Sequence, residues 1–89
     1  MQKVTVVYGV LNERDGAFTV SFPDAPRATG QGLTRDQAIE VAQLRLRAWV
    51  DRERHAGREF MPRPVQELAW DDAVKVALQL GMELVAVPL

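Results

Sequence analysis

The chain has no cysteine, a single histidine and no long apolar run, and each absence removes a class of protein. Without cysteine there is no disulfide scaffold, no thiol nucleophile and no zinc–cysteine site. With His55 alone, a site built from several histidines is excluded as well. No apolar stretch approaches the roughly 20 residues that span a bilayer, and the N-terminus lacks the apolar centre of a signal peptide. We therefore expect a soluble cytoplasmic protein with no metal ion and no cofactor.

The chain also has little net charge, with 11 basic and 12 acidic residues and a balance of −1. No global charge therefore directs it to nucleic acids or to an anionic membrane surface. Its 89 residues are enough for one domain and too few for two. A domain of this size has a thin stability margin, which favours self-association into a dimer or tetramer.

The first quarter of the chain predicts two strands joined by a tight turn. Residues 2–11 alternate with apolar side chains on both faces, which indicates a strand near the centre of a sheet. The dipeptide Asp15-Gly16 is typical of a hairpin turn because it provides positive φ angles. The strand that follows alternates cleanly, with Phe18, Val20 and Phe22 facing inward.

A third strand and a long helix follow. The corner at residues 23–26 holds two prolines and should end the second strand. Residues 27–32 predict a weak strand, whose glycines indicate an edge position or a close backbone approach. Thr34 and Gln37 fit a capping box, so a helix should begin at Arg35 and run to about residue 54.

The remaining chain predicts a second helical piece at residues 67–80 and a final strand at residues 82–89. The predicted fold class is therefore α+β. A three-stranded antiparallel meander is joined by a C-terminal strand. One long helix and a second, shorter helix are expected to cover one face of this sheet.

The long helix carries two apolar stripes at helical spacing. The first stripe should pack on the sheet, and it consists of Ala38, Ile39, Ala42, Leu46, Trp49 and Val50. The second stripe, formed by Val41, Leu44 and Ala48, falls nearly opposite. Either the second helical piece covers it, or it is a surface for an oligomer or a partner.

Arginines are concentrated between Arg45 and Arg63, where six of them stand against three acidic residues. Such a stretch can face RNA or an acidic partner. It can also be a solvated helix face with internal ion pairs, such as Asp51 with His55 or Arg54. We favour the solvated face, because no nucleic-acid motif surrounds these arginines.

No catalytic residue is predicted. His55 lies at a charged helix end, with no serine or cysteine nucleophile in a recognisable context. A two-metal nuclease needs several carboxylates that converge on one site, including one on the central strand. The first strand, residues 2–11, contains neither aspartate nor glutamate.

The segment from Asp15 to Pro26, with Thr29, Gly30, Gly32 and Thr34, resembles the HicB family of bacterial antitoxins. That family shows an Asp-Gly turn, a strand ending in Phe-Pro-Asp-x-Pro, a short strand with glycine and a capped long helix with alanines. A glycine, a Pro-x-Pro connector and a hydrophobic strand then close the domain. Their counterparts here are Gly57, residues 62–64 and residues 84–89. The chain departs from the family at Ala25, Arg27 and Ala28, where leucine, glycine and often cysteine are usual.

The resemblance implies a partial ribonuclease-H-like fold without nuclease activity. It implies a non-catalytic antitoxin domain that neutralises a HicA-type mRNA-cleaving toxin by covering its active surface, and that self-associates. Many members bind DNA through a further C-terminal module. We expect residues 1–89 to be a single toxin-binding domain that lacks this module. The alternative hypothesis is a self-associating structural or regulatory domain without a toxin partner. An RNA-processing enzyme is a third and weaker hypothesis.

Two regions are the predicted sites of partner contact. One is the corner after the second strand, and the other is the second stripe of the long helix. The candidate residues are Phe22, Asp24, Arg27, Val41, Leu44 and Ala48.

Overall fold

The structure is a computed structural model that describes residues 5–89. The predicted start of the first strand, at residues 2–4, lies outside this range. The elements are β1 (Val6–Arg14), β2 (Ala17–Phe22), β3 (Ala25–Gly32), α1 (Arg35–His55), α2 (Val65–Leu68), α3 (Asp72–Gln79) and β4 (Glu83–Pro88).

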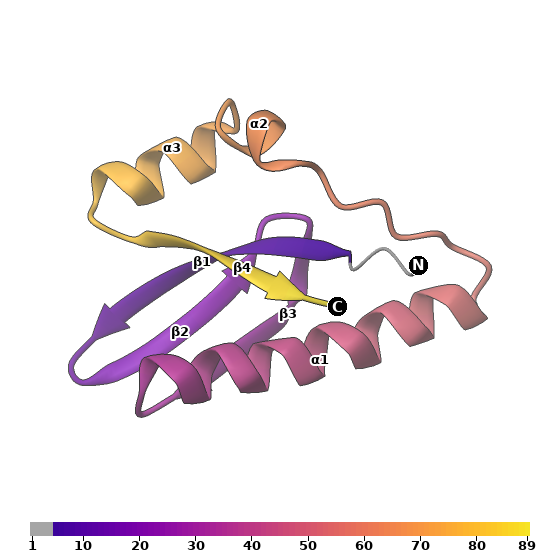
Figure 1. The fold of residues 1–89 in the computed structure, drawn as a ribbon, viewed down its shortest axis with the longest axis horizontal. Coiled ribbons are helices and arrows are strands. Elements are labelled where there is room, and N and C mark those ends of the chain that lie inside the picture. The colour runs from indigo at the N-terminus through magenta and orange to yellow at the C-terminus, as the bar shows by residue number, and fades with distance from the viewer. Residues whose placement is uncertain (1–4) are drawn as a thin grey trace.

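The four strands form one antiparallel sheet in the order β3-β2-β1-β4 (Figure 1). The predicted α+β class, with a meander and a C-terminal strand, is confirmed. Strand β1 is central, and β3 lies at an edge of the sheet, as the sequence predicted. At the other edge, the Leu89 amide donates a hydrogen bond to the Thr5 carbonyl at 2.8 Å.

The hairpin between β1 and β2 turns on Asp15 and Gly16, as predicted. Their φ angles are 54° and 79°, and Arg14 pairs with Ala17 across the turn. Two successive positive φ angles define the turn type whose twist matches that of antiparallel strands. This turn fixes the register that points Val20 and Phe22 toward the core.

Helix α1 packs on one face of the sheet through the first predicted stripe. Ala38, Ala42, Leu46 and Val50 are buried there. Ile39 and Trp49 are partly buried against the same core. Opposite them lie buried side chains of β1, β2 and β4, namely Val7, Leu11, Val20, Phe22, Val85 and Val87.

The predicted close approach occurs where α1 crosses β3. A Cβ atom added to Gly30 would lie 2.3 Å from the Ala42 nitrogen, and one added to Gly32 would lie 2.6 Å from the Ala38 nitrogen. Only glycine leaves room for a helix backbone at this distance. The glycines of β3 therefore set how closely the long helix packs on the sheet.

Both predicted ends of α1 are confirmed. The Thr34 hydroxyl accepts a hydrogen bond from the Gln37 amide at 3.1 Å, and the Gln37 side chain accepts one from the Leu33 amide at 2.7 Å. The first bond satisfies an amide that the first helical turn leaves free, and the second ties the residue before the N-cap to the helix. Past the C-terminus, Gly57 takes a φ of 78° and turns the chain out of the helix.

The second helical piece differs from its prediction, since two helices occupy residues 65–79 where one was expected. The break falls at Asp71, whose carboxylate accepts hydrogen bonds from the amides of Ala73 and Val74 at 3.0 and 3.2 Å. An aspartate in this arrangement starts a new helix rather than continuing an old one. Helix α3 ends before Gly81, which has a φ of 88°.

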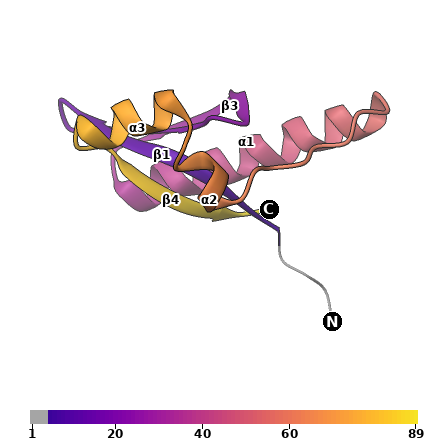
Figure 2. The same ribbon diagram turned by 90° about the horizontal axis from the view of Figure 1, so that it is seen from above.

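The prediction that both helices cover one face is wrong for the shorter one. Val10 alternates with Leu11, which faces α1, so Val10 points to the other side of the sheet. There Val10 lines a cavity together with Val74 and Ala77 of α3. The sheet thus lies between α1 and α3 (Figures 1 and 2). Amphipathicity alone does not encode which side a helix takes, and here the long connector after α1 returns the chain across the sheet.

Candidate partner-binding surface

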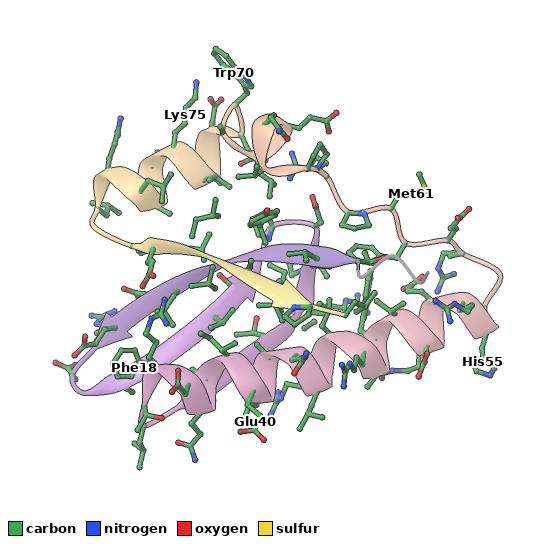
Figure 3. The ribbon with its side chains drawn as sticks, viewed as in Figure 1. Phe18, Glu40, His55, Met61, Trp70 and Lys75 are labelled. Carbon is green, nitrogen blue, oxygen red and sulfur yellow. The ribbon has the colours of Figure 1, made fainter. Side chains whose placement is uncertain are left out.

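Within residues 5–89, no group of three or more histidine, cysteine, aspartate or glutamate side chains is placed to hold a metal ion. His55 lies at the exposed end of α1, far from the sheet (Figure 3). Its Nδ1 atom lies 2.7 Å from the backbone carbonyl of Asp51. The predicted pairing of the Asp51 carboxylate with His55 or Arg54 is not among the ion pairs of the described residues. In this same part of the chain, no helix has the length and apolar character needed to cross a bilayer.

The structure separates the six predicted contact residues into two groups. Phe22 is 1% exposed and belongs to the core, so its side chain offers no surface to a partner. The Asp24 side chain is 13% exposed and is held by Arg63. The other four, Arg27, Val41, Leu44 and Ala48, have side chains that are exposed or half-buried.

The second stripe of α1 is uncovered. Leu44 is 59% exposed, Ala48 is exposed and Val41 is half-buried. The prediction that the second helical piece covers this stripe is wrong, because α3 lies across the sheet from α1. We call Val41, Leu44 and Ala48 the Leu44 face. It lies on the side of α1 turned away from the sheet, where Glu40 also projects outward (Figure 3).

Next to the Leu44 face, arginines from two elements line a common hollow of about 590 Å³. Arg27 comes from β3, while Arg45 and Arg52 come from α1. We call these three residues and the space between them the arginine hollow. Ala48 lines it as well, so the hollow and the Leu44 face form one continuous surface.

The arginine hollow has one acidic residue in its lining, and that residue is already paired. Glu53 accepts a hydrogen bond from Arg58, which raises the pKa of the Arg58 guanidinium. Arg27, Arg45 and Arg52 take part in none of the ion pairs among residues 5–89. The hollow is therefore positively charged and open to an anionic group.

Asp24 serves the fold through a bridge to the segment that follows α1. Its carboxylate accepts hydrogen bonds from the Arg63 backbone amide at 2.8 Å and from the Arg63 Nε at 2.6 Å. Arg63 also donates to Asp71 through Nη1 at 3.0 Å. The pKa of Arg63 is raised, first by Asp24 and then by Asp71. The pKa of Asp71 is lowered, first by the Val74 amide and then by Arg63.

Sequence reasoning did not single out Arg45, Arg52 or Arg63 as individual site residues. Arg45 and Arg52 could have been found, because they lie about two helical turns apart on α1 and flank Ala48. Arg63 gave a weaker signal, namely its position between Pro62 and Pro64 in a rigid connector. Its partners are 39 and 8 residues away, and no local pattern joins them.

No family model matches the chain, and no curated protein matches it. Among solved structures, the chain is similar to the crystal structure of the N-terminal domain of Burkholderia pseudomallei antitoxin HicB. The TM-score is 0.76 at 23% sequence identity, and the match covers 96% of this chain and 98% of that one. At this identity the likeness establishes the fold, and the resemblance read from the sequence is confirmed at that level. The chain has the fold of the N-terminal domain of HicB.

Proposed function

We propose that this chain is a non-catalytic binding domain of the antitoxin type, and that it neutralises a HicA-type toxin by covering the active surface of that toxin. Its fold is shared with a domain of an antitoxin. Steric blocking requires a complementary surface that is already formed, and it requires no reactive group. We propose a cytoplasmic setting, because such a toxin would act on messenger RNA.

The Leu44 face carries this proposal. Leu44, in the middle of the long helix, is 59% exposed beside the half-buried Val41 and the exposed Ala48, and exposed apolar groups that cluster in this way mark protein contacts. Helix α1 is fixed by its close packing on Gly30 and Gly32. A partner therefore meets a surface that need not be ordered on binding, which preserves affinity.

Co-expression with the product of a neighbouring reading frame of toxin size tests the proposal. We expect a complex to copurify and the growth arrest caused by the toxin to be relieved. The Leu44→Glu substitution should reduce recovery of the complex, because it places a charge in an apolar contact. Leu33→Glu is the matched control, since Leu33 is 78% exposed but precedes α1. If the toxin stays free and active beside the unaltered chain, the proposal is wrong.

Self-association without a toxin is the second candidate function, and the same uncovered face favours it. A dimer or tetramer that buries Leu44 would exceed 10 kDa in light scattering, and Leu44→Glu would return it to a monomer with its fold retained. The arginines count against the simplest dimer. In a symmetric antiparallel pair of α1 helices, the same side of the helix meets in both copies. Arg45 and Arg52 of one copy would therefore lie against the same two arginines of the other and repel them.

A further inference from the structure

The arginine hollow combines positive charge with apolar surface in a way that selects a particular kind of partner. Arg45 and Arg52 rise from one side of α1, and Arg27 faces them from the edge strand β3. All three side chains belong to exposed residues. Between them lies Ala48, which belongs equally to the Leu44 face. A ligand that binds here must therefore offer negative charge to the arginines and an apolar group to Ala48.

The charge of the hollow is not compensated by the residues that line it. Glu53 is engaged by Arg58, and its side chain is 20% exposed. A partner that covered Arg27, Arg45 and Arg52 without carboxylates of its own would bury charges that lack a counterion, which is strongly unfavourable. Carboxylates suit these positions well, because guanidinium groups donate paired hydrogen bonds to them.

The apolar component favours a protein over a nucleic acid. Single-stranded RNA binds where bases stack on exposed aromatic rings beside cations. Trp49, the one aromatic residue lining the hollow, is partly buried and packs edge-on against Phe60 with a centroid distance of 5.2 Å. The exposed groups beside the arginines are instead aliphatic, namely Leu44 and Ala48. Aliphatic side chains at helical spacing match the face of an amphipathic helix.

We propose that the Leu44 face and the arginine hollow together bind an acidic amphipathic segment of a protein partner. An apolar side chain of that segment would rest on Leu44 and Ala48, and its carboxylates would reach Arg27, Arg45 and Arg52. This inference rests on the proposed function, since it concerns the same surface. It adds that the segment of the toxin bound at this surface is acidic and amphipathic.

A titration of the isotope-labelled chain, followed by NMR, tests the proposal with defined probes. The first probe is a short synthetic helical peptide with leucines on one face and glutamates beside them. The second has the same leucines with lysines in place of the glutamates. The third is a single-stranded RNA oligonucleotide of mixed sequence. We expect the acidic peptide to shift the amides around Arg27, Arg45 and Ala48 in a saturable way that weakens with salt. The lysine peptide should leave them unchanged.

Charge reversal then locates the binding. The double variant Arg45→Glu/Arg52→Glu should weaken the acidic peptide more than about tenfold, because attraction becomes repulsion. Arg47→Glu is the matched control, since Arg47 is an exposed arginine of α1 outside the hollow, and its effect should be less than about twofold. Binding that ignores the double variant, absence of binding, or tighter binding of the RNA to the same amides would each overturn the proposal.

The toxin complex separates this inference from the proposed function. If a toxin copurifies and is released by Leu44→Glu but not by Arg45→Glu/Arg52→Glu, the antitoxin role stands and the acidic segment is wrong. If no toxin binds while the acidic peptide does, the antitoxin role is wrong and the surface chemistry stands.

Discussion

The two faces of the sheet are covered by different means. On one face, α1 contributes four fully or nearly buried residues to a continuous core that includes β1, β2 and β4. On the other face, α3 buries Val74, and a cavity of about 280 Å³ lies between it and the sheet. Trp70, Val76, Leu78 and Leu80, which are large apolar residues of this second region, are exposed.

The comparison shows that the two regions depend on different forces. Helix α1 is held by close packing, since the glycines of β3 and the alanines of α1 let the two backbones approach each other. The segment 63–80 buries Leu68 and Val74, and the bridge from Asp24 through Arg63 to Asp71 ties it to the corner after β2. Trp70 lies on the outer side of this segment, where the Lys75 amine is 4.9 Å from its ring (Figure 3). Packing changes should therefore act on the first region, and charge changes on the second.

The largest effect is expected from Gly30→Ala, which attacks the packed face. The new Cβ would lie 2.3 Å from the Ala42 nitrogen, and a backbone atom of a packed helix cannot move aside cheaply. We expect a loss of more than about 3 kcal/mol in the free energy of unfolding, measured by urea denaturation. Gly16→Ala is the control. It meets no atom within 4 Å, and its positive φ should cost only about 1 kcal/mol. Equal losses in both variants would contradict the packing argument.

Arg63→Ala should separate the two regions. Loss of the side chain removes ion pairs to both Asp24 and Asp71, and leaves those carboxylates without their cation. We expect amide hydrogen exchange to speed up across α2 and α3, while the amides of α1 and the sheet keep their protection. Arg47→Ala is the matched control, since Arg47 is exposed and lies outside the ion pairs of residues 5–89. A uniform rise in exchange would show that the regions unfold as one unit.

Low pH should loosen the region of α2 and α3, as the Arg63→Ala substitution should. The lowered pKa of Asp71 means that its contribution to stability is fully present above the ordinary carboxyl pKa and is lost as the pH falls through the lowered one. Arg63 stays protonated throughout, because its pKa is raised. We expect the α3 amide signals to change below about pH 4, before those of α1. In Asp71→Asn the amide can still cap the helix but carries no charge, so this pH dependence should be weaker.

A small effect is expected from Thr34→Ala, which tests the packed region at the start of α1. Loss of the hydroxyl removes the hydrogen bond from the Gln37 amide and should cost about 1 kcal/mol in urea denaturation. Because α1 belongs to the main core, the loss should appear in a single global transition. Thr29→Ala, which removes a bond of 3.2 Å to the Pro26 carbonyl, should cost less than about 0.5 kcal/mol.

Features that depend on residues close together in the sequence were predicted correctly. The alternation in β2, the Asp15-Gly16 turn, the Thr34 cap and the packed stripe of α1 are all confirmed. The burial of Phe22 follows from the same alternation, and it outweighs the suggestion that this side chain meets a partner. The break before Asp71 was missed because helical spacing continues through it. The side of the sheet taken by α3 and the reach of Arg63 to Asp24 depend on contacts between distant segments, which spacing along one chain does not contain.

The hydrogen bond between Leu89 and Thr5 brings the first and last described residues together at one edge of the sheet. A short peptide linker could therefore join these two positions. A circular permutant opened at the exposed Asp15-Gly16 turn would keep all four strands beside their present neighbours, since permutation is tolerated at such sites. In such a molecule β1 and β2 would no longer be consecutive, and the order in which the sheet assembles could be studied apart from its final structure.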